Sequence, residues 1–120
     1  MRYQGRAYIS GPMTGYPGYN YAAFNDAEAA LTTEGEVDVI NPARNFDGRS
    51  DHPGGRAAYM RLDVGHVLDA DLVFVLPGWE KSRGARLEIL TAQELGLPVF
   101  DFVTREPLAD LVVTYVRAAA

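Results

Sequence analysis

Four short apolar runs divide the chain, and the first three stop before a Gly-Pro, Asn-Pro or Pro-Gly pair. Short apolar runs bounded by such residues are typical of buried β-strands. The third run is apolar at every position, which indicates a strand covered on both faces. The predicted strands cover residues 6–10 (RAYIS), 37–40 (VDVI), 72–76 (LVFVL) and 99–102 (VFDF).

Apolar residues at helical spacing follow each predicted strand. In the first of these helices, Asn20 is the expected N-cap and Gly35 ends the helix. In the last helix, Pro107 suits the first turn, because a residue there needs no hydrogen bond to its nitrogen. The predicted helices cover residues 21–33, 56–69, 84–95 and 107–117.

Strands and helices alternate along the whole chain, with no internal repeat and no linker. Such alternation predicts a single α/β domain over residues 1–120, built on a parallel sheet of four to five strands with helices on both faces. Sheets of this kind bind ligands at the carboxyl ends of their strands. The loops after residues 10, 40 and 76 are therefore the places where we expect a site.

The composition argues against several classes of function. A net charge of −5 with a single lysine, Lys81, does not suit a nucleic-acid partner, which needs clustered cations. The absence of cysteine rules out thiol catalysis and suits a reducing, cytoplasmic location. His52 and His66 have no partners at metal-ligand spacing, so no metal site is expected. No apolar run approaches the ~18 residues that span a bilayer, so no membrane partner is expected either.

The first candidate loop follows the first strand and is rich in glycine. Glycines let backbone N–H groups approach a ligand, and the start of the next helix favours an anion. The loop lacks both common nucleotide motifs, GxGxxG and GK[ST], so an ordinary strand-exit turn is the alternative. The candidate substrate-binding residues here are Ser10, Gly11, Pro12, Met13, Thr14 and Gly15.

The second candidate loop follows the third strand and leads into the helix that carries Glu88. Ser82 is a natural N-cap for this helix, and Gly84 allows a ligand to approach closely. A carboxylate near a helix N-terminus is expected to stay ionised, as a nucleophile must. The alternative is a solvated helix glutamate without a function. Trp79 and Arg83 complete the binding residues expected here.

Asp63 and Tyr8 are further catalytic candidates. Asp63 lies on the helix before the third strand, where a surface ion pair is the alternative. Tyr8 lies in the first strand and either aims its hydroxyl at the site or packs in the core. Residues 43–55 form a long polar loop that has almost nothing to bury and is expected to close over the site. Its arginines, Arg44 and Arg49, could then meet a substrate anion.

Four stretches of the chain form a recognisable set: YISGPMTG at 8–15, YMRLD at 59–63, ADLVFVLPGWEKSRGARLE at 70–88 and AQELGLPVF at 92–100. Together they resemble the nucleoside 2-deoxyribosyltransferase superfamily. More narrowly, they resemble the small phage and bacterial proteins grouped as domain of unknown function 4406. GWEKSRGARLE is the most specific part. The resemblance covers roughly residues 6–102 and implies a flavodoxin-like (Rossmann-like) fold.

The resemblance also implies roles for individual residues. The glutamate matching Glu88 is the superfamily's nucleophile on the anomeric carbon, and the aspartate matching Asp63 helps to position the sugar or the catalytic groups. A tyrosine matching Tyr8 lies near the nucleophile, and the loop matching residues 10–15 lines the site. True deoxyribosyltransferases carry an aspartate six residues before the glutamate, where this chain has Ser82. At this position the chain is similar to the nucleoside 5′-monophosphate N-hydrolase branch, in which a serine binds the 5′-phosphate.

These features predict cleavage of the N-glycosidic bond of (deoxy)nucleoside 5′-monophosphates through Glu88, with release of the nucleobase and no cofactor. Two alternatives stay open: a deoxyribosyltransferase that exchanges bases, and a non-catalytic protein that binds a nucleotide. The related enzymes complete their sites with a neighbouring subunit, which implies a homodimer or a larger assembly. Tyr16, Tyr19 and Tyr21 are candidate subunit contacts or pocket residues.

Overall fold

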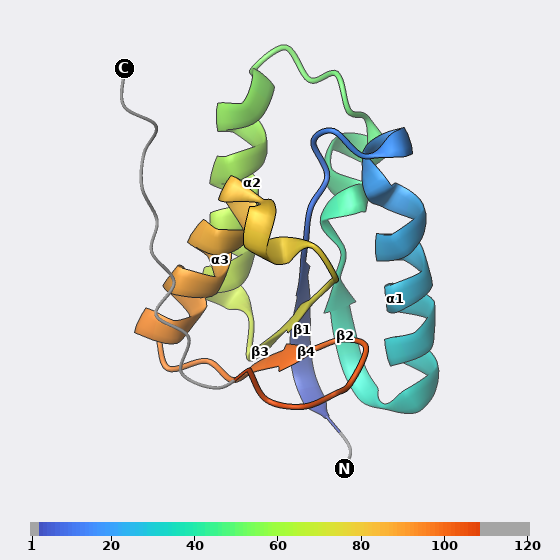
Figure 1. The fold of residues 1–120 in the computed structure, drawn as a ribbon, viewed down its shortest axis with the longest axis vertical. Coiled ribbons are helices and arrows are strands. Elements are labelled where there is room, and N and C mark those ends of the chain that lie inside the picture. The colour runs from blue at the N-terminus through green and yellow to red at the C-terminus, as the bar shows by residue number, and fades with distance from the viewer. Residues whose placement is uncertain (1–2, 109–120) are drawn as a thin grey trace.

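The computed structural model of the chain describes residues 3–108. Within them, four parallel strands form one sheet: β1 (Gln4–Ser10), β2 (Glu36–Ile40), β3 (Leu72–Val75) and β4 (Val99–Asp101). Their order across the sheet is β2-β1-β3-β4, and Figure 1 shows the strands between the helices. The predicted α/β class and parallel sheet are confirmed, and the strand order agrees with a flavodoxin-like fold.

Three α-helices within these residues cover the two faces of the sheet: α1 (Tyr21–Glu34), α2 (Gly55–Asp69) and α3 (Arg83–Glu94). Successive residues of a strand point to opposite faces, so the sheet supplies two separate apolar layers. One layer includes Phe24 and Leu31 of α1, and the other includes Val67 of α2 and Ile89 of α3. The prediction of helices on both faces is therefore confirmed. None of the helices described here is long and apolar enough to cross a membrane.

β1 and β3 lie side by side in the sheet, but the chain leaves them in opposite directions. After β1, α1 leads to β2 at one edge, and after β3, α3 leads to β4 at the other edge. Ser10 and Val75 are the paired residues at the ends of the two strands. The carboxyl ends of β1 and β3 therefore border the crevice where parallel sheets of this kind bind ligands.

The start of α1 differs from the prediction that Asn20 caps it. Asn20 has a left-handed backbone conformation, with a φ angle of 61°, and its side chain makes no capping hydrogen bond. Its amide nitrogen instead donates to the carbonyl oxygen of Pro12 at 2.9 Å, which ties the loop after β1 to the 3-10 element η1 (Pro17–Asn20). At the other end, Gly35 closes α1 as predicted by donating its N–H to the carbonyl of Leu31.

The prediction of a long polar loop at 43–55 is wrong for the first half of that segment. This part belongs to the 3-10 element η2 (Pro42–Gly48), in which Ala43 and Asn45 are buried. Asn41 caps the element by accepting the N–H of Ala43 at 2.9 Å. The expectation that this segment buries almost nothing is wrong, because Ala43 belongs to the apolar layer that also contains α1.

The helix predicted at 107–117 lies outside the described residues from position 109 onward. Its first residue, Pro107, forms an isolated antiparallel bridge with Phe100. The next residue, Leu108, donates its N–H to the carbonyl of Val99 at 2.8 Å. The prediction that Pro107 lies in the first turn of a helix is therefore wrong, because this residue continues the edge of the sheet beside β4.

Candidate active site

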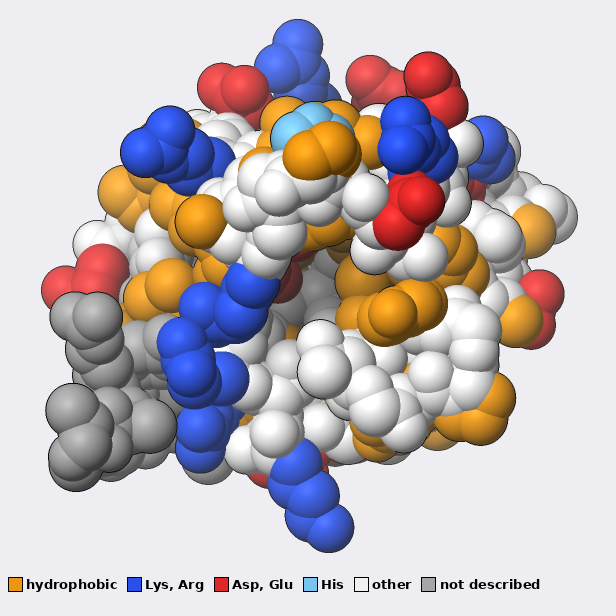
Figure 2. All heavy atoms as spheres, turned by 90° about the horizontal axis from the view of Figure 1, so that it is seen from above, with side chains coloured by type: hydrophobic (Ala, Val, Ile, Leu, Met, Phe, Trp, Pro, Cys, Tyr) orange, Lys and Arg blue, Asp and Glu red, His pale blue; other side chains and the backbone are white. Residues whose placement is uncertain are grey.

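A pocket opens where the loops that follow β1 and β3 meet (Figure 2). Its volume of about 370 Å³ is in the usual range for small-molecule sites. It is lined by the loop after β1, the start of α1, the segment after β2, α2 and the start of α3. In Figure 2, Lys and Arg side chains border one side of the hollow, and acidic atoms are visible inside it.

Glu88 lines this pocket from α3 and is only 5% exposed. One of its carboxyl oxygens, Oε1, accepts two hydrogen bonds from β1. The hydroxyl of Ser10 donates to it at 2.8 Å and the hydroxyl of Tyr8 at 3.1 Å. The alternative of a solvated helix glutamate is therefore wrong, since this acidic group is buried and held by two donors.

Burial raises the pKa of Glu88 to about 8, and the neighbouring charge of Asp63 is the next largest cause. The hydroxyls of Ser10 and Tyr8 and the guanidinium of Arg56 oppose the rise. The expectation that the helix N-terminus keeps Glu88 ionised is therefore wrong in the resting pocket. A helix terminus contributes about 0.3–1 kcal/mol, which is less than the cost of burying a charge.

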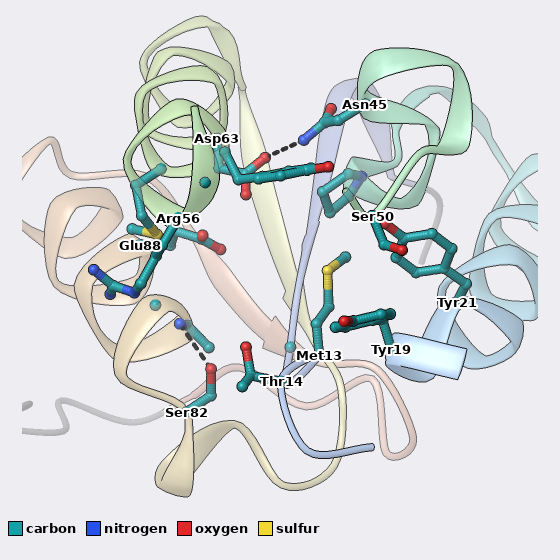
Figure 3. A pocket seen from close by; sticks show the side chains of 17 residues that line it. Met13, Thr14, Tyr19, Tyr21, Asn45, Ser50, Arg56, Asp63, Ser82 and Glu88 are labelled. Carbon is teal, nitrogen blue, oxygen red and sulfur yellow. Dashed lines mark hydrogen bonds between the residues drawn. The ribbon is translucent and has the colours of Figure 1, made fainter. Parts of the chain in front are cut away.

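Asp63 faces the same pocket from α2 and is 8% exposed. The side-chain nitrogen of Asn45 donates to Asp63 Oδ1 at 2.6 Å (Figure 3). Burial raises the pKa of Asp63 to about 6, against the opposing hydrogen bonds from Asn45 and Tyr8. The alternative of a surface ion pair is wrong, because the group is buried and its hydrogen-bond partner is an amide.

Tyr8 connects the two carboxyl groups. It is fully buried, and burial, followed by the charges of Glu88 and Asp63, raises the pKa of its hydroxyl well above the usual range. The neutral hydroxyl interacts with both carboxyl groups, but it has one proton to donate, and that proton points to Glu88. Groups linked in this way release their two protons in two steps, and the pKa values of these steps belong to the pair.

A protein-family model matches residues 5–101, and its description is "Domain of unknown function (DUF4406)". The chain belongs to this family. No curated protein matches the chain. The matched segment contains Tyr8, Asp63 and Glu88, so the carboxyl pair lies within the DUF4406 domain.

The start of α3 forms a polar side of the pocket. Ser82 caps α3 as predicted, since its Oγ accepts the N–H of Ala85 at 3.2 Å. Gly84 also lines the pocket, and a Cβ there would lie 3.3 Å from the sulfur of Met60. Arg56 of α2 lies on the same side as Ser82 (Figure 3). Ser82, the N-terminus of α3 and Arg56 thus border the same side of the pocket, which suits an anion.

Tyrosines form the opposite side of the pocket. Tyr19 and Tyr21 lie there with Met13 near them (Figure 3). Tyr59 of α2 also lines the pocket, and its hydroxyl is held by donating to a backbone carbonyl at 2.6 Å. Tyr16, the third tyrosine singled out from the sequence, lies outside this lining. Aromatic faces of this kind suit a planar ring such as a nucleobase.

Five of the expected binding residues, including Ser10, lie outside the lining of the pocket. Pro12 is buried in the loop after β1, and Gly15 is exposed in the same loop. Arg83 is exposed at the first position of α3. Trp79 packs against the apolar layer shared by α2 and α3. Tyr8 and Ser10 lie directly behind Glu88. The predicted residues that the pocket brings together are Gly11, Met13, Thr14, Asp63, Ser82, Gly84 and Glu88.

Asn45 and His66 are functional candidates that the sequence did not suggest. The Oδ1 atom of Asn45 lies 3.3 Å from His66 Nε2, while its amide nitrogen faces Asp63. The amide is therefore held between two partners and points its donor at the carboxyl group.

Within residues 3–108, no group of three or more His, Asp or Glu side chains could hold a metal ion.

Arg56 takes the position that was expected for Arg44 and Arg49. Arg44 pairs with Glu28 at 2.7 Å, and Arg49 pairs with Asp51 at 3.1 Å, both on the exterior. The sequence did contain a signal for Arg56. It lies seven residues before Asp63 on the same helix, which is two turns and therefore the same face.

Proposed function

We propose that this chain cleaves the N-glycosidic bond of (deoxy)nucleoside 5′-monophosphates and releases the nucleobase, with Glu88 as the nucleophile. The observation that carries the proposal is the buried pair of Glu88 and Asp63 facing one pocket. Buried carboxyl groups are costly, so two of them with raised pKa values in a cavity support a catalytic role. Glycosidases use two carboxyl groups in this way.

The arrangement of the pocket supports a nucleotide as the ligand. Figure 3 shows Ser82 and the two tyrosines, Tyr19 and Tyr21, on opposite sides. In our proposal the phosphate binds Ser82, the first N–H groups of α3 and Arg56, because charge-assisted hydrogen bonds favour an anion there. The base stacks on the tyrosine side. The sugar then lies between them, where its C1′ atom can reach Glu88.

The reaction would proceed in two steps. In the first, a carboxylate oxygen of Glu88 bonds to C1′, and the C1′–N bond breaks with its electron pair leaving on the base. The base nitrogen takes up a proton, which protonated Asp63 supplies. In the second step, water attacks C1′ and gives a proton back to Asp63. The sugar 5-phosphate leaves and the carboxylate of Glu88 is restored.

The proton on the carboxyl pair decides which form is reactive. Burial raises the pKa of both carboxyl groups, and the two values belong to the pair, whereas attack requires the proton on Asp63 and the charge on Glu88. Ser10 and Arg56 favour charge on Glu88 and so support the reactive arrangement, whereas Tyr8 favours charge on both carboxyl groups. A doubly protonated pair would lack the nucleophile, and a doubly ionised pair would lack the acid.

The test is incubation with matched nucleoside 5′-monophosphates and nucleosides, followed by chromatography of the free base and the sugar phosphate. We expect release from the monophosphates and none by Glu88→Gln. Calorimetry with Glu88→Gln then measures binding without turnover. If the wild-type protein binds the monophosphates but releases no base, the chain is a nucleotide-binding protein and the proposal is wrong.

Base exchange is the nearest enzymatic alternative, because it passes through the same glycosyl-enzyme and differs only in the acceptor. Ser82 favours hydrolysis of a phosphorylated substrate, since an aspartate in its place would repel the phosphate. A second free base added to the reaction separates the two outcomes. A new nucleotide would identify a transferase, and sugar phosphate alone would identify a hydrolase.

A further inference from the structure

Ser10 was expected to bind substrate, but the structure gives it a different partner. It is the last residue of β1 and is fully buried. Its hydroxyl donates to Glu88 Oε1 at 2.8 Å, which is the shorter of the two hydrogen bonds to that oxygen. Ser10 therefore acts on Glu88 from behind and does not line the pocket.

Ser10 and Tyr8 reach the same carboxyl oxygen because they are two residues apart on one strand. Alternate residues of a strand share a face, and this face of β1 packs against α2 and α3. Both hydroxyls therefore point at Glu88 from the sheet. In the described part of the chain, neither of them nor any other side chain donates to Oε2.

We propose that Ser10 is a positioning residue that, together with Tyr8, anchors Oε1 of Glu88 and leaves Oε2 as the oxygen that attacks C1′. This inference rests on the proposed function for its catalytic consequence. Its structural part, a hydroxyl that stabilises and orients ionised Glu88, holds for any ligand of the pocket.

The two donors are not equivalent. Tyr8 interacts with Asp63 as well as Glu88, and its single proton can serve one of them at a time. The hydroxyl of Ser10 donates to Glu88. Ser10 thus keeps its hydrogen bond when Tyr8 turns to Asp63, and Oε1 stays fixed while the proton moves within the pair.

Removal of the Ser10 hydroxyl should act on the ionisation of Glu88 directly. The charged or titratable groups around Glu88 are Asp63 and Arg56 on α2 and Tyr8 on β1. Ser10 does not titrate, so Ser10→Ala leaves all three in place and removes only a donor that stabilises the carboxylate. The pKa of Glu88 should therefore rise in this variant.

The experiment is a carboxyl ¹³C NMR titration of the ligand-free protein, compared with kinetics. In Ser10→Ala, the pKa of Glu88 should rise by about one to two pH units, as expected for a lost hydrogen bond to a charged group. The kcat for base release should fall roughly 10–100-fold, with KM within about twofold, because the lost contact orients the nucleophile and does not bind substrate.

Three further variants control for damage to the fold, two at Ser10 and one at Thr91. Ser10→Cys keeps the size of the side chain but supplies a weak donor, so it should behave like Ser10→Ala. Ser10→Thr keeps the hydroxyl and should restore the wild-type titration. Thr91→Val removes a neighbouring hydroxyl on α3 that bonds to the carbonyl of Leu87, and it should leave Glu88 unchanged.

The readouts separate failure of the inference from failure of the proposed function. An unchanged pKa of Glu88 in both Ser10→Ala and Ser10→Cys would overturn the positioning role, whatever the activity. An unchanged kcat in an active enzyme would overturn the assignment of Oε2 as the attacking atom. If the wild-type protein releases no base at all, the proposed function fails, and the titration still decides whether Ser10 stabilises ionised Glu88.

Discussion

The carboxyl groups of Asp63 and Glu88 face one pocket from neighbouring helices, and the charge of Asp63 is the second cause, after burial, of the raised pKa of Glu88. The two helices pack on the same face of the sheet, where Val67 and Ile89 share an apolar layer. Like charges that are buried close together resist ionising at the same time, so the protonation of each group depends on the other.

Base release should follow a bell-shaped pH profile, because the reactive pair carries one proton. Activity should rise with pH as the first proton leaves, near the lower pKa of about 6, and fall as the second leaves, near about 8. These limits belong to the pair as a whole. Measurement of kcat against pH checks the prediction, and a flat profile between about pH 5 and pH 9 would contradict it.

Asp63→Asn is the matched control for this profile. It keeps the size of the side chain but removes the like charge and the proton donor, so the pKa of Glu88 should fall. The pH profile of kcat should then keep only the limb that rises with pH. The kcat itself should be lower by roughly 10²–10⁴-fold, because the general acid is lost. A bell that survives in this variant would show that another group supplies the proton.

Glu88→Gln should abolish base release and stabilise the fold at high pH. The unfolded side chain ionises near 4.5, whereas in the folded chain the pKa is raised to about 8. The folded state thus binds the proton more tightly, and wild-type stability falls as pH rises through this window and levels off above it. Glutamine does not ionise, so the variant should escape this loss and gain roughly 2–4 kcal/mol at about pH 9.

Urea denaturation at several pH values measures this difference. The gap between variant and wild type should be small near pH 4.5, where the side chain is mostly protonated in the folded state, and grow as pH increases. A constant gap across the range would show that Glu88 ionises freely in the folded chain. That result would also remove the physical basis for the bell-shaped activity profile.

Much of the fold and part of the site could be predicted from local pattern. The apolar run at 72–76 and the turn residues around it located β3, and Ser82 was recognisable as the N-cap of α3. The loop positions and the family resemblance identified Glu88 and Asp63 as catalytic candidates. The sequence did not predict that they are buried, because their burial depends on how α2 and α3 pack against β1.

The failures have physical reasons of the same kind. Asn20 is a residue type that often caps helices, but here its side-chain amide donates to the carbonyl oxygen of Pro12 in the loop after β1. Asn45 belongs to a polar stretch that looked like open loop, and only the tertiary fold shows that its amide faces Asp63. Sequence patterns indicate what a segment prefers locally, whereas these contacts join elements far apart in the chain.

Arg56→Gln should weaken binding of nucleoside monophosphates and leave the binding of nucleosides unchanged. Arg56 lines the pocket but is exposed, so its contact with a phosphate should be worth roughly a 5–30-fold change in KM. Arg61→Gln is the matched control, because Arg61 lies on the same helix and is exposed away from the pocket lining. If both variants weaken monophosphate binding equally, Arg56 acts only through its long-range charge and does not contact the phosphate.

Substitutions of Ser82 should separate its two roles, capping α3 and binding phosphate. Ser82→Ala loses the cap to Ala85 and should lower the free energy of unfolding by about 0.5–2 kcal/mol. Ser82→Asp keeps a good N-cap and should fold as stably as the wild type. Its charge should nevertheless repel a phosphate, so only this variant loses phosphate binding without losing stability.

The preference for phosphate is best measured by calorimetry in a Glu88→Gln background, where no turnover occurs. A hydrogen bond to a charged group contributes about 1.5–3 kcal/mol, so a monophosphate should bind at least tenfold more tightly than its nucleoside. Adding Ser82→Asp should erase this ratio by weakening the monophosphate alone, since the nucleoside carries no charge to repel. Equal affinity for both ligands when Ser82 is present would defeat the phosphate assignment. Base exchange on an uncharged nucleoside would then become the better explanation of the same carboxyl pair.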